Sequence, residues 1–310
     1  MTAPMRIPGR AIALFVALVL ALGWLVALPL WLGGEGAAPL AGILLPALMW
    51  TPAAATAIVI LAMKAPRRDV LRFLGVWPLR PIRRTIGFAV GALLGPIVVT
   101  VLVIAVAVWL GLVRLDLVGF SGFAAQLAAS GVDPETLPLG TLVLVQLLTV
   151  PIAAIVPNAI LALGEEIGWR GWLLPALRPW GTWPALLVTG AVWGLWHAPI
   201  VLLGHNFGRT DLTGVLLMIA GCVAWGVLLG WTRLRTGSVW PAVLAHGSLN
   251  AVGGMVLVLA AAGEPVDLAV VGPLGVVAWG VIAAIVGVIA LAGGFRDART
   301  SARLETQPGA

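Results

Sequence analysis

Charged side chains are scarce in this sequence: Asp, Glu, Lys and Arg make up 10% of the chain, whereas hydrophobic residues make up 61%. Tyrosine is absent, and cysteine occurs once, as Cys222. A single cysteine excludes an intrachain disulfide and a cysteine-rich metal site. A soluble domain has about 25% charged residues. We therefore expect a membrane protein.

Long apolar runs fill most of the chain. A transmembrane helix needs about 20 consecutive apolar residues, and runs of this kind lie at 11–32, 38–63, 85–113, 139–163, 182–203, 212–232, 238–262 and 268–292. The first run is too long for the apolar core of a signal peptide, so we expect it to be a retained span. The sequence predicts an all-α, polytopic transmembrane helical bundle of about eight spans.

Basic residues mark one side of this bundle. With eight alternating spans, 16 of the 18 Lys and Arg residues fall on the side that holds both termini, and the other side holds Arg114 and Arg209. Lys and Arg collect in cytoplasmic loops, so we expect both termini to be cytoplasmic. The net charge of +6 is then an orientation signal, and the expected partners are membrane lipids and no nucleic acid.

Motifs and polar stretches divide the chain into four regions. We expect an N-terminal three-span region at 1–137, a core with the main polar motifs at 138–262, a last span at 263–292 and a disordered tail at 293–310. Within the first region, residues 64–84 carry seven basic residues among Leu, Phe and Trp. This mixture is typical of an interfacial segment on an anionic leaflet.

Two adjacent carboxylates and an arginine stand near the fourth apolar run, at Glu165, Glu166 and Arg170. Inserting a charged side chain at bilayer depth costs about 2.5–3.5 kcal/mol, so charged residues inside a span indicate a functional site. Arg170 follows Glu166 by one helical turn, so these two side chains are expected to pair. Glu165 points elsewhere on the helix and is expected to be the free carboxylate.

Further polar residues occur in two later apolar runs. His197 follows Trp193 by four residues, and Asn250 follows His246 by four, so each pair shares one helical face. A lone buried histidine is more often a core residue than a ligand. Together with an unpaired glutamate, however, these residues indicate a polar site inside the bundle. His205 lies between two runs and is expected to be a loop residue.

This constellation resembles the CPBP family, the intramembrane endopeptidases of the CAAX-processing and bacteriocin-processing type. The family pattern E-E-x-x-x-R, F-x-x-x-H and H-x-x-x-N is similar to Glu165 to Arg170, Trp193 to His197, and His246 to Asn250. Order and spacing both match. The departure is Trp193, where phenylalanine is commoner. The resemblance covers roughly residues 140 to 255.

The resemblance implies hydrolysis of a peptide bond in a membrane-associated protein or peptide. Glu165 would then be the general base, with His197 helping to hold the water. His246 and Asn250 would stabilise the oxyanion, and the pair of Glu166 and Arg170 would orient Glu165. We expect no cofactor to be required, and the site to open on the cytoplasmic side. A zinc ion held by Glu165, His197 and His246 is the alternative.

Other functions remain open. A transporter, or a non-catalytic membrane partner, could use the same buried Glu and His cluster as a relay or binding site. The H-E-x-x-H zinc motif is absent from the sequence. The tetrapeptide Gly119 to Gly122 spells the G-x-S-G turn of an intramembrane serine protease, but it lies in a loop region. With 17 arginines against one lysine, a GC-rich bacterial genome and a bacterial plasma membrane are expected.

The predicted spans contain one inconsistency of depth. If the fourth span ended at Glu165 and the fifth began near Thr182, His197 would lie about 22 Å from Glu165 along the bilayer normal. These two residues could not share a water molecule. We therefore predict that the fourth helix continues through Trp172 to Leu177, after a break permitted by Pro151 and Pro157.

Overall fold

The computed structural model describes residues 7–79 and 81–296, and its regular structure there is helical apart from one isolated antiparallel bridge, Leu115 to Ala260. The α-helices are α1 (Gly9–Gly33), α2 (Ala41–Met49), α3 (Thr51–Met63), α4 (Val70–Leu74), α5 (Ile82–Trp109), α6 (Ser121–Ala129), α7 (Leu139–Ala153), α8 (Ile160–Glu166), α9 (Leu174–Leu177), α10 (Thr182–Trp196), α11 (Ala198–Val201), α12 (Leu212–Thr236), α13 (Trp240–Val252), α14 (Met255–Leu259), α15 (Leu268–Val271) and α16 (Val276–Leu291). The shorter 3₁₀ and π segments are η1 (Gly34–Leu40), η2 (Pro134–Thr136), η3 (Ala154–Ala159), η4 (Ile167–Leu173) and η5 (Arg178–Trp180).

Seven helical segments of the described chain are long and apolar enough to cross a membrane, which identifies a multi-pass membrane protein. They are Gly9–Gly33, Gly36–Met63, Ile82–Trp109, Leu139–Trp180, Leu212–Thr236, Trp240–Leu259 and Leu268–Leu291. The predicted eighth span, 182–203, does not form one helix of that length: α10 has 15 residues, and the chain turns at His197 before α11. Pro199 in the first turn of α11 has no N–H to continue the α10 ladder. A helix of this length reaches about 22 Å.

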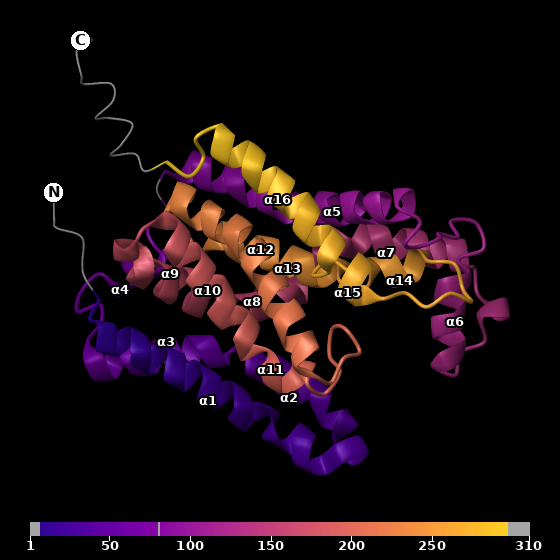
Figure 1. The fold of residues 1–310 in the computed structure, drawn as a ribbon, viewed down its shortest axis with the longest axis horizontal. Coiled ribbons are helices and arrows are strands. Elements are labelled where there is room, and N and C mark those ends of the chain that lie inside the picture. Colours follow the sequence, from indigo (N-terminus) through magenta and orange to yellow (C-terminus); the bar gives the residue numbers. More distant parts are fainter. Residues whose placement is uncertain (1–6, 80, 297–310) are drawn as a thin grey trace, which may run out of the picture.

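Although short, α10 lies inside the bundle, because it packs along α12 (Figure 1). A Cβ atom on Gly194 would lie 2.4 Å from the Cα of Ile219, and one on Gly190 would lie 2.7 Å from the Cα of Val223. Small residues allow such close backbone approach between membrane helices. The two glycines therefore set the position of α10 and of the residues at its end.

The segment Leu139–Trp180 has 42 residues and is bent. Val156, directly before Pro157, has non-helical backbone angles (φ −136°, ψ 116°). After this break the chain is helical from Ile160 through Leu177. The predicted extension of the fourth helix is confirmed, and Glu165 lies in the interior of a long helical segment instead of at its end.

The two ends of the bundle differ in charge. We call one the basic end: there α1 begins, α16 ends, and α4 and α9 lie (Figure 1). The basic side chains of the segment 64–79 are exposed at this end, namely Lys64, Arg67, Arg68 and Arg72. The described ends of the chain share the basic end, while its cytoplasmic orientation stays a prediction. Residues 297–310 of the predicted disordered tail lie outside the described residues.

The opposite end carries α6, α14 and the loops around them (Figure 1). Its two arginines are both paired, Arg114 with Glu264 and Arg209 with Asp267. Asp116 has a pKa well below its usual range, first because the Ser121 side chain hydrogen-bonds to it and then because backbone N–H groups, such as that of Gly119, donate to it. These bonds fasten the loop that precedes α6.

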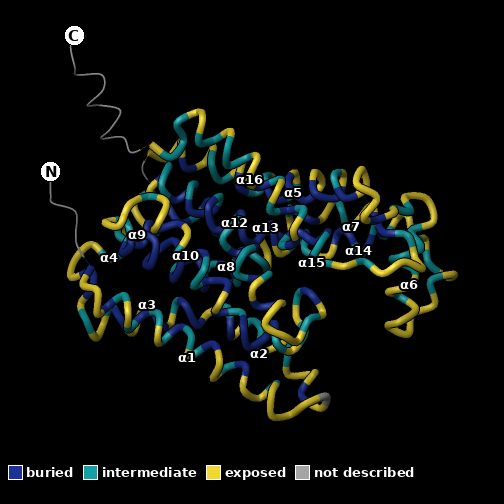
Figure 2. The backbone as a smooth tube through the Cα atoms, in the orientation of Figure 1, coloured by how far each residue is buried: buried dark blue, intermediate teal, exposed yellow. Residues whose placement is uncertain are grey.

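Burial is concentrated in the middle of the bundle, in α8, α10, α12 and α13 (Figure 2). The outward faces of the surrounding helices expose large apolar side chains, for example Leu61, Trp109 and Leu291. Such faces suit a lipid surrounding, in which apolar exposure carries no penalty. Glu165, Glu166, Arg170 and His246 are buried in this central part, where the site lies.

Candidate active site

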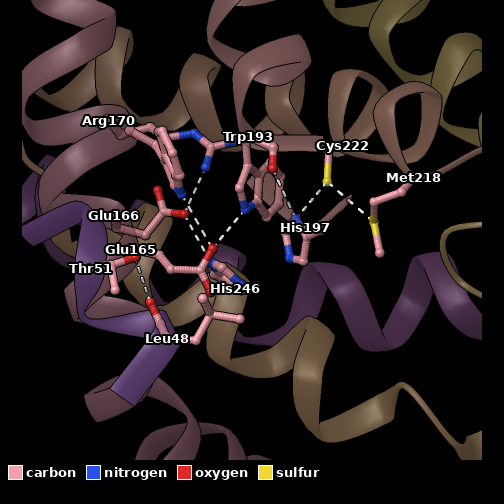
Figure 3. A network of polar contacts seen from close by, with 11 residues as sticks. Leu48, Thr51, Glu165, Glu166, Arg170, Trp193, His197, Met218, Cys222 and His246 are labelled. Carbon is pink, nitrogen blue, oxygen red and sulfur yellow. Dashed lines mark hydrogen bonds and ion pairs between the residues drawn. The ribbon is translucent and has the colours of Figure 1, made fainter. Parts of the chain in front are cut away.

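Glu166, Arg170 and His246 form the deepest part of the site (Figure 3). The Oε1 atom of Glu166 accepts a hydrogen bond from Nη1 of Arg170 at 2.7 Å and lies 2.9 Å from Nδ1 of His246. Glu166 and Arg170 have no exposed surface. The predicted pair of Glu166 and Arg170 is confirmed, and His246 joins it from α13.

Glu165 has different partners. Its Oε2 atom accepts hydrogen bonds from the indole Nε1 atoms of Trp193 at 2.7 Å and Trp169 at 3.3 Å, and its Oε1 atom lies 3.8 Å from Nε2 of His246. Within the described chain Glu165 forms no ion pair with Lys or Arg. One oxygen of this carboxylate is thus held by neutral donors, and the other faces His246.

The local chain explains how these carboxylates reach the centre. Directly after Glu166 the chain adopts the π segment η4, a form that often occurs at functional sites. Two glycines let this helical segment approach the start of α3. A Cβ atom on Gly164 would lie 2.6 Å from the carbonyl oxygen of Met49, and one on Gly168 would lie 2.5 Å from Cβ of Pro52.

His197 lies at the turn between α10 and α11. Its Nδ1 atom is 2.9 Å from the carbonyl oxygen of Trp193 and 4.0 Å from the sulfur of Cys222. A carbonyl oxygen only accepts, so Nδ1 carries the proton. In the neutral ring, Nε2 is then an acceptor that can hold a water molecule by one of its protons.

The position of the proton on the His246 ring follows from the same argument. The Glu166 carboxylate accepts, so Nδ1 of His246 carries a proton, and Nε2 is left on the side of Glu165. The Trp193 ring meets the imidazole edge-on, with centroids 5.1 Å apart, and the Arg170 guanidinium carbon lies 4.4 Å from the centroid of the same indole. Trp193 therefore contacts three polar groups of the site.

A cavity of about 600 Å³ adjoins this cluster. Glu165, His197, His246 and Asn250 all line it, and so does Asn158. Asn250 is exposed, and its amide has no hydrogen-bond partner among the described residues. Glu166 and Arg170 are absent from the lining and lie behind Glu165 and His246. These residues come from three helical segments, Leu139–Trp180, α10 and α13, and converge on one space that is large enough for a ligand.

A family comparison agrees with this arrangement. Residues 141–252 match the model of the family described as type II CAAX prenyl endopeptidase Rce1-like. The chain contains an Rce1-like domain. The comparison with curated proteins finds no match. The matched residues include all six residues that the sequence analysis singles out for catalysis, and they lie within the predicted core 138–262.

Two tryptophans of the Rce1-like domain, Trp169 and Trp193, also belong to the site, although the sequence pattern indicates no polar role for them. Trp169 follows Glu165 by one helical turn, a spacing that identifies it in retrospect as a neighbour. Trp193 takes the place of the phenylalanine that is commoner in the family pattern. Its indole N–H is a donor that phenylalanine lacks, and the contact with Glu165 spans 28 positions of sequence.

A metal site in the Rce1-like domain would need several ligating side chains close together. Across residues 7–79 and 81–296, no three His, Cys, Asp or Glu side chains gather into a group that could hold a metal ion. The Nδ1 atom of His197 donates to the Trp193 carbonyl and that of His246 to Glu166, which leaves the Nε2 atom of each ring free. In the positions that the described side chains take, Glu165, His197 and His246 do not form such a group.

The serine of the G-x-S-G tetrapeptide lies outside the Rce1-like domain, at the first residue of α6. The hydroxyl of Ser121 accepts a hydrogen bond from the N–H of Ala262 at 3.0 Å and also bonds to Asp116. These contacts fasten two loops together at the opposite end of the bundle. The alternative of a serine protease therefore gains no support from the surroundings of Ser121.

Proposed function

We propose that this chain is an intramembrane endopeptidase that hydrolyses a peptide bond with water activated by Glu165. The observation that carries the proposal is that Glu165, His197, His246 and Asn250 line one cavity inside an Rce1-like domain. We further propose that it acts in a bacterial plasma membrane, on a membrane-associated protein or peptide. The composition, with 17 arginines against one lysine, supports that location.

Glu165 is suited to take a proton from water. Its Oε2 atom is held by the indoles of Trp193 and Trp169, while Oε1 remains for the water. The unprotonated Nε2 of His197 accepts the second proton of that water in a hydrogen bond and so orients its lone pair toward the substrate carbonyl. General-base catalysis of this type contributes typically about 10²- to 10⁴-fold in rate.

The attack gives a tetrahedral intermediate with a negatively charged oxygen. Asn250, whose amide is unoccupied in the cavity, donates to this oxygen, and Nε2 of His246 donates when the ring is an imidazolium ion. Such donors typically contribute about 10²- to 10³-fold each. The C–N bond then breaks, and Glu165 returns its proton to the leaving amine, so a carboxylic acid and an amine are released.

Glu166 and Arg170 act on this chemistry through their neighbours. Glu166 holds the His246 ring by Nδ1, and Arg170 balances the charge of Glu166. Their burial without exposed surface makes this unit rigid. We assign both as positioning residues.

The proposal is tested with purified protein in detergent micelles and a library of labelled peptides. The wild type is expected to cleave, and Glu165→Gln is expected to lose at least about 10²-fold in rate. Glu135→Gln, at an exposed glutamate of η2, is the matched control and should retain full activity. Failure of the wild type to cleave, or cleavage that survives Glu165→Gln, would contradict the proposal.

Chelation separates the metal-free mechanism from the zinc alternative. Incubation with a zinc chelator should leave the cleavage rate unchanged. Metal analysis of the purified protein measures how much zinc it holds. If the cleavage rate falls on chelation and returns when zinc is added, the attacking water is activated by a metal ion and not by Glu165 alone.

A further inference from the structure

The cavity of the site opens away from the basic end. Its exposed lining residues are His205, Gly208, Asn250 and Gly254. Along α10, which starts at the basic end, His197 comes about 22 Å from the start, and the loop 204–208 lies farther on. Along α13, Gly254 likewise lies about 21 Å beyond Trp240. The lining therefore continues from Glu165 and His246 toward the opposite end.

The route from the basic end is closed. Trp169, Trp172 and Leu173 lie on that side of the glutamates and have no exposed surface. Phe15 stacks on Trp172 with centroids 4.8 Å apart and meets Trp169 edge-on at 6.0 Å. Together these rings form a plug between the basic end and the site, which contradicts the expected opening on the basic, cytoplasmic side.

The segment 64–79 covers this plug. The indole of Trp172 donates to the carbonyl oxygen of Ala65, and Arg233 donates to the carbonyl oxygens of Arg170 at 3.1 Å and Phe73 at 2.7 Å. Arg233 is itself buried. A substrate at the basic end would have to displace both the segment and the aromatic plug.

The charges of the two ends indicate which side of the membrane each faces. The exposed cations of the segment 64–79 belong to the basic end and have no ion pair within the described part of the chain. Both arginines of the opposite end, by contrast, are neutralised by acidic partners. Cytoplasmic loops are rich in Lys and Arg, and acidic residues contribute little to orientation. The cavity mouth therefore belongs to the extracytoplasmic side.

We propose that this protein takes its substrate from the extracytoplasmic side of the membrane: a peptide segment of a membrane-anchored protein that emerges there, in place of a cytoplasmic C-terminus. The assignment of the occupant as a peptide rests on the proposed endopeptidase function. The side from which the cavity is reached rests on the geometry and charge described above, and it is measured without any cleavage assay.

Thiol labelling of intact cells tests the proposal. The single native thiol is removed by Cys222→Ala, and cysteines are placed one at a time. Gly254→Cys reports on the cavity, since Gly254 is exposed and a Cβ atom there meets nothing within 4 Å. Arg68→Cys reports on the basic end, and Ser130→Cys on the opposite end outside the cavity. A membrane-impermeant maleimide is the probe, with permeabilised cells as the reference.

We expect Gly254→Cys and Ser130→Cys to be labelled in intact cells, and Arg68→Cys only after permeabilisation. Labelling of Gly254→Cys on the same side as Arg68→Cys would overturn the proposal. So would labelling of Arg68→Cys in intact cells, which would reverse the orientation, or no labelling of Gly254→Cys in either preparation, which would show a closed cavity. Loss of the endopeptidase function alone would leave the labelling pattern unchanged, so the two failures are distinguishable.

Discussion

Trp193 connects the functional groups of the site. It donates to Glu165, its ring lies beside the Arg170 guanidinium, and its edge contacts His246. Phenylalanine, the commoner residue of the family pattern, would retain the two ring contacts and lose the hydrogen bond. In this chain the carboxylate of Glu165 therefore depends on an indole for its orientation.

We predict that Trp193→Phe lowers kcat about tenfold with KM unchanged, since the Glu165 carboxylate loses its shorter hydrogen bond and with it part of its alignment. The free energy of unfolding should fall by about 1–3 kcal/mol because a buried acceptor loses a donor. Peptide cleavage and thermal unfolding in detergent measure the two effects.

Trp172→Phe is the matched control for that variant. It also removes a buried indole hydrogen bond, to the carbonyl of Ala65, and should reduce stability comparably while kcat is retained. If both variants lose kcat equally, Trp193 acts through general stability and not through Glu165.

At the scale of the elements, the contact between α8 and the junction of α2 and α3 positions both glutamates. Gly164 precedes Glu165, and backbone atoms of Met49 and Trp50 occupy the space that a Cβ atom would need, at 2.6 and 2.9 Å. Backbone cannot move aside as the end of a flexible side chain can. The helical segment would have to shift instead, together with Glu165.

We predict that Gly164→Ala lowers the free energy of unfolding by about 1–3 kcal/mol, the usual cost of overpacking, and reduces cleavage. Gly87→Ala on α5 is the matched control, because nothing lies within 4 Å of a Cβ atom there. That variant should be neutral or more stable by about 0.4–1 kcal/mol. Equal melting temperatures for the two variants would argue against a close contact between α8 and the junction of α2 and α3.

Across the whole molecule, Arg233 joins regions far apart in sequence. Its guanidinium lies between the segment 64–79 and the π segment that holds Arg170, and a Cβ atom on Gly75 would lie 2.7 Å from its Cζ. Gly75 has φ +73°, a conformation that favours glycine. The covering of the basic end therefore depends on one buried cation and one permissive backbone position.

We predict that Arg233→Met releases the segment 64–79, because the carbonyls of Arg170 and Phe73 lose their donor. An unsatisfied buried group costs about 1–3 kcal/mol, which corresponds to roughly 5- to 150-fold more of the open form. Trypsin cleavage after Arg67, Arg68 or Arg72 should accelerate accordingly. Arg235→Met, two residues further along α12 and on another face of the helix, should leave the cleavage rate at these sites unchanged. Equal rates for the two variants would rule out this role of Arg233.

Local features of the sequence were sufficient to predict the membrane class, most of the spans, the pair of Glu166 and Arg170, and the continuation of the fourth helix. Each depends on residues within a few turns of one another: apolar run length, the spacing of four residues, and the position of proline. The same reasoning failed at 182–203, because run length does not reveal that the chain turns at His197 and that α10 is held by close packing on α12.

The remaining features depend on contacts across long stretches of chain. His246 reaches Glu166 over 80 positions and Arg233 reaches Phe73 over 160, so no periodicity of the sequence records these contacts. Folding alone brings the indoles to Glu165, places the aromatic plug on the basic side and leaves the cavity open at the opposite end. Residue types and spacing thus specify the candidate chemistry of this protein, whereas the packing of its helices sets the direction from which a substrate can reach it.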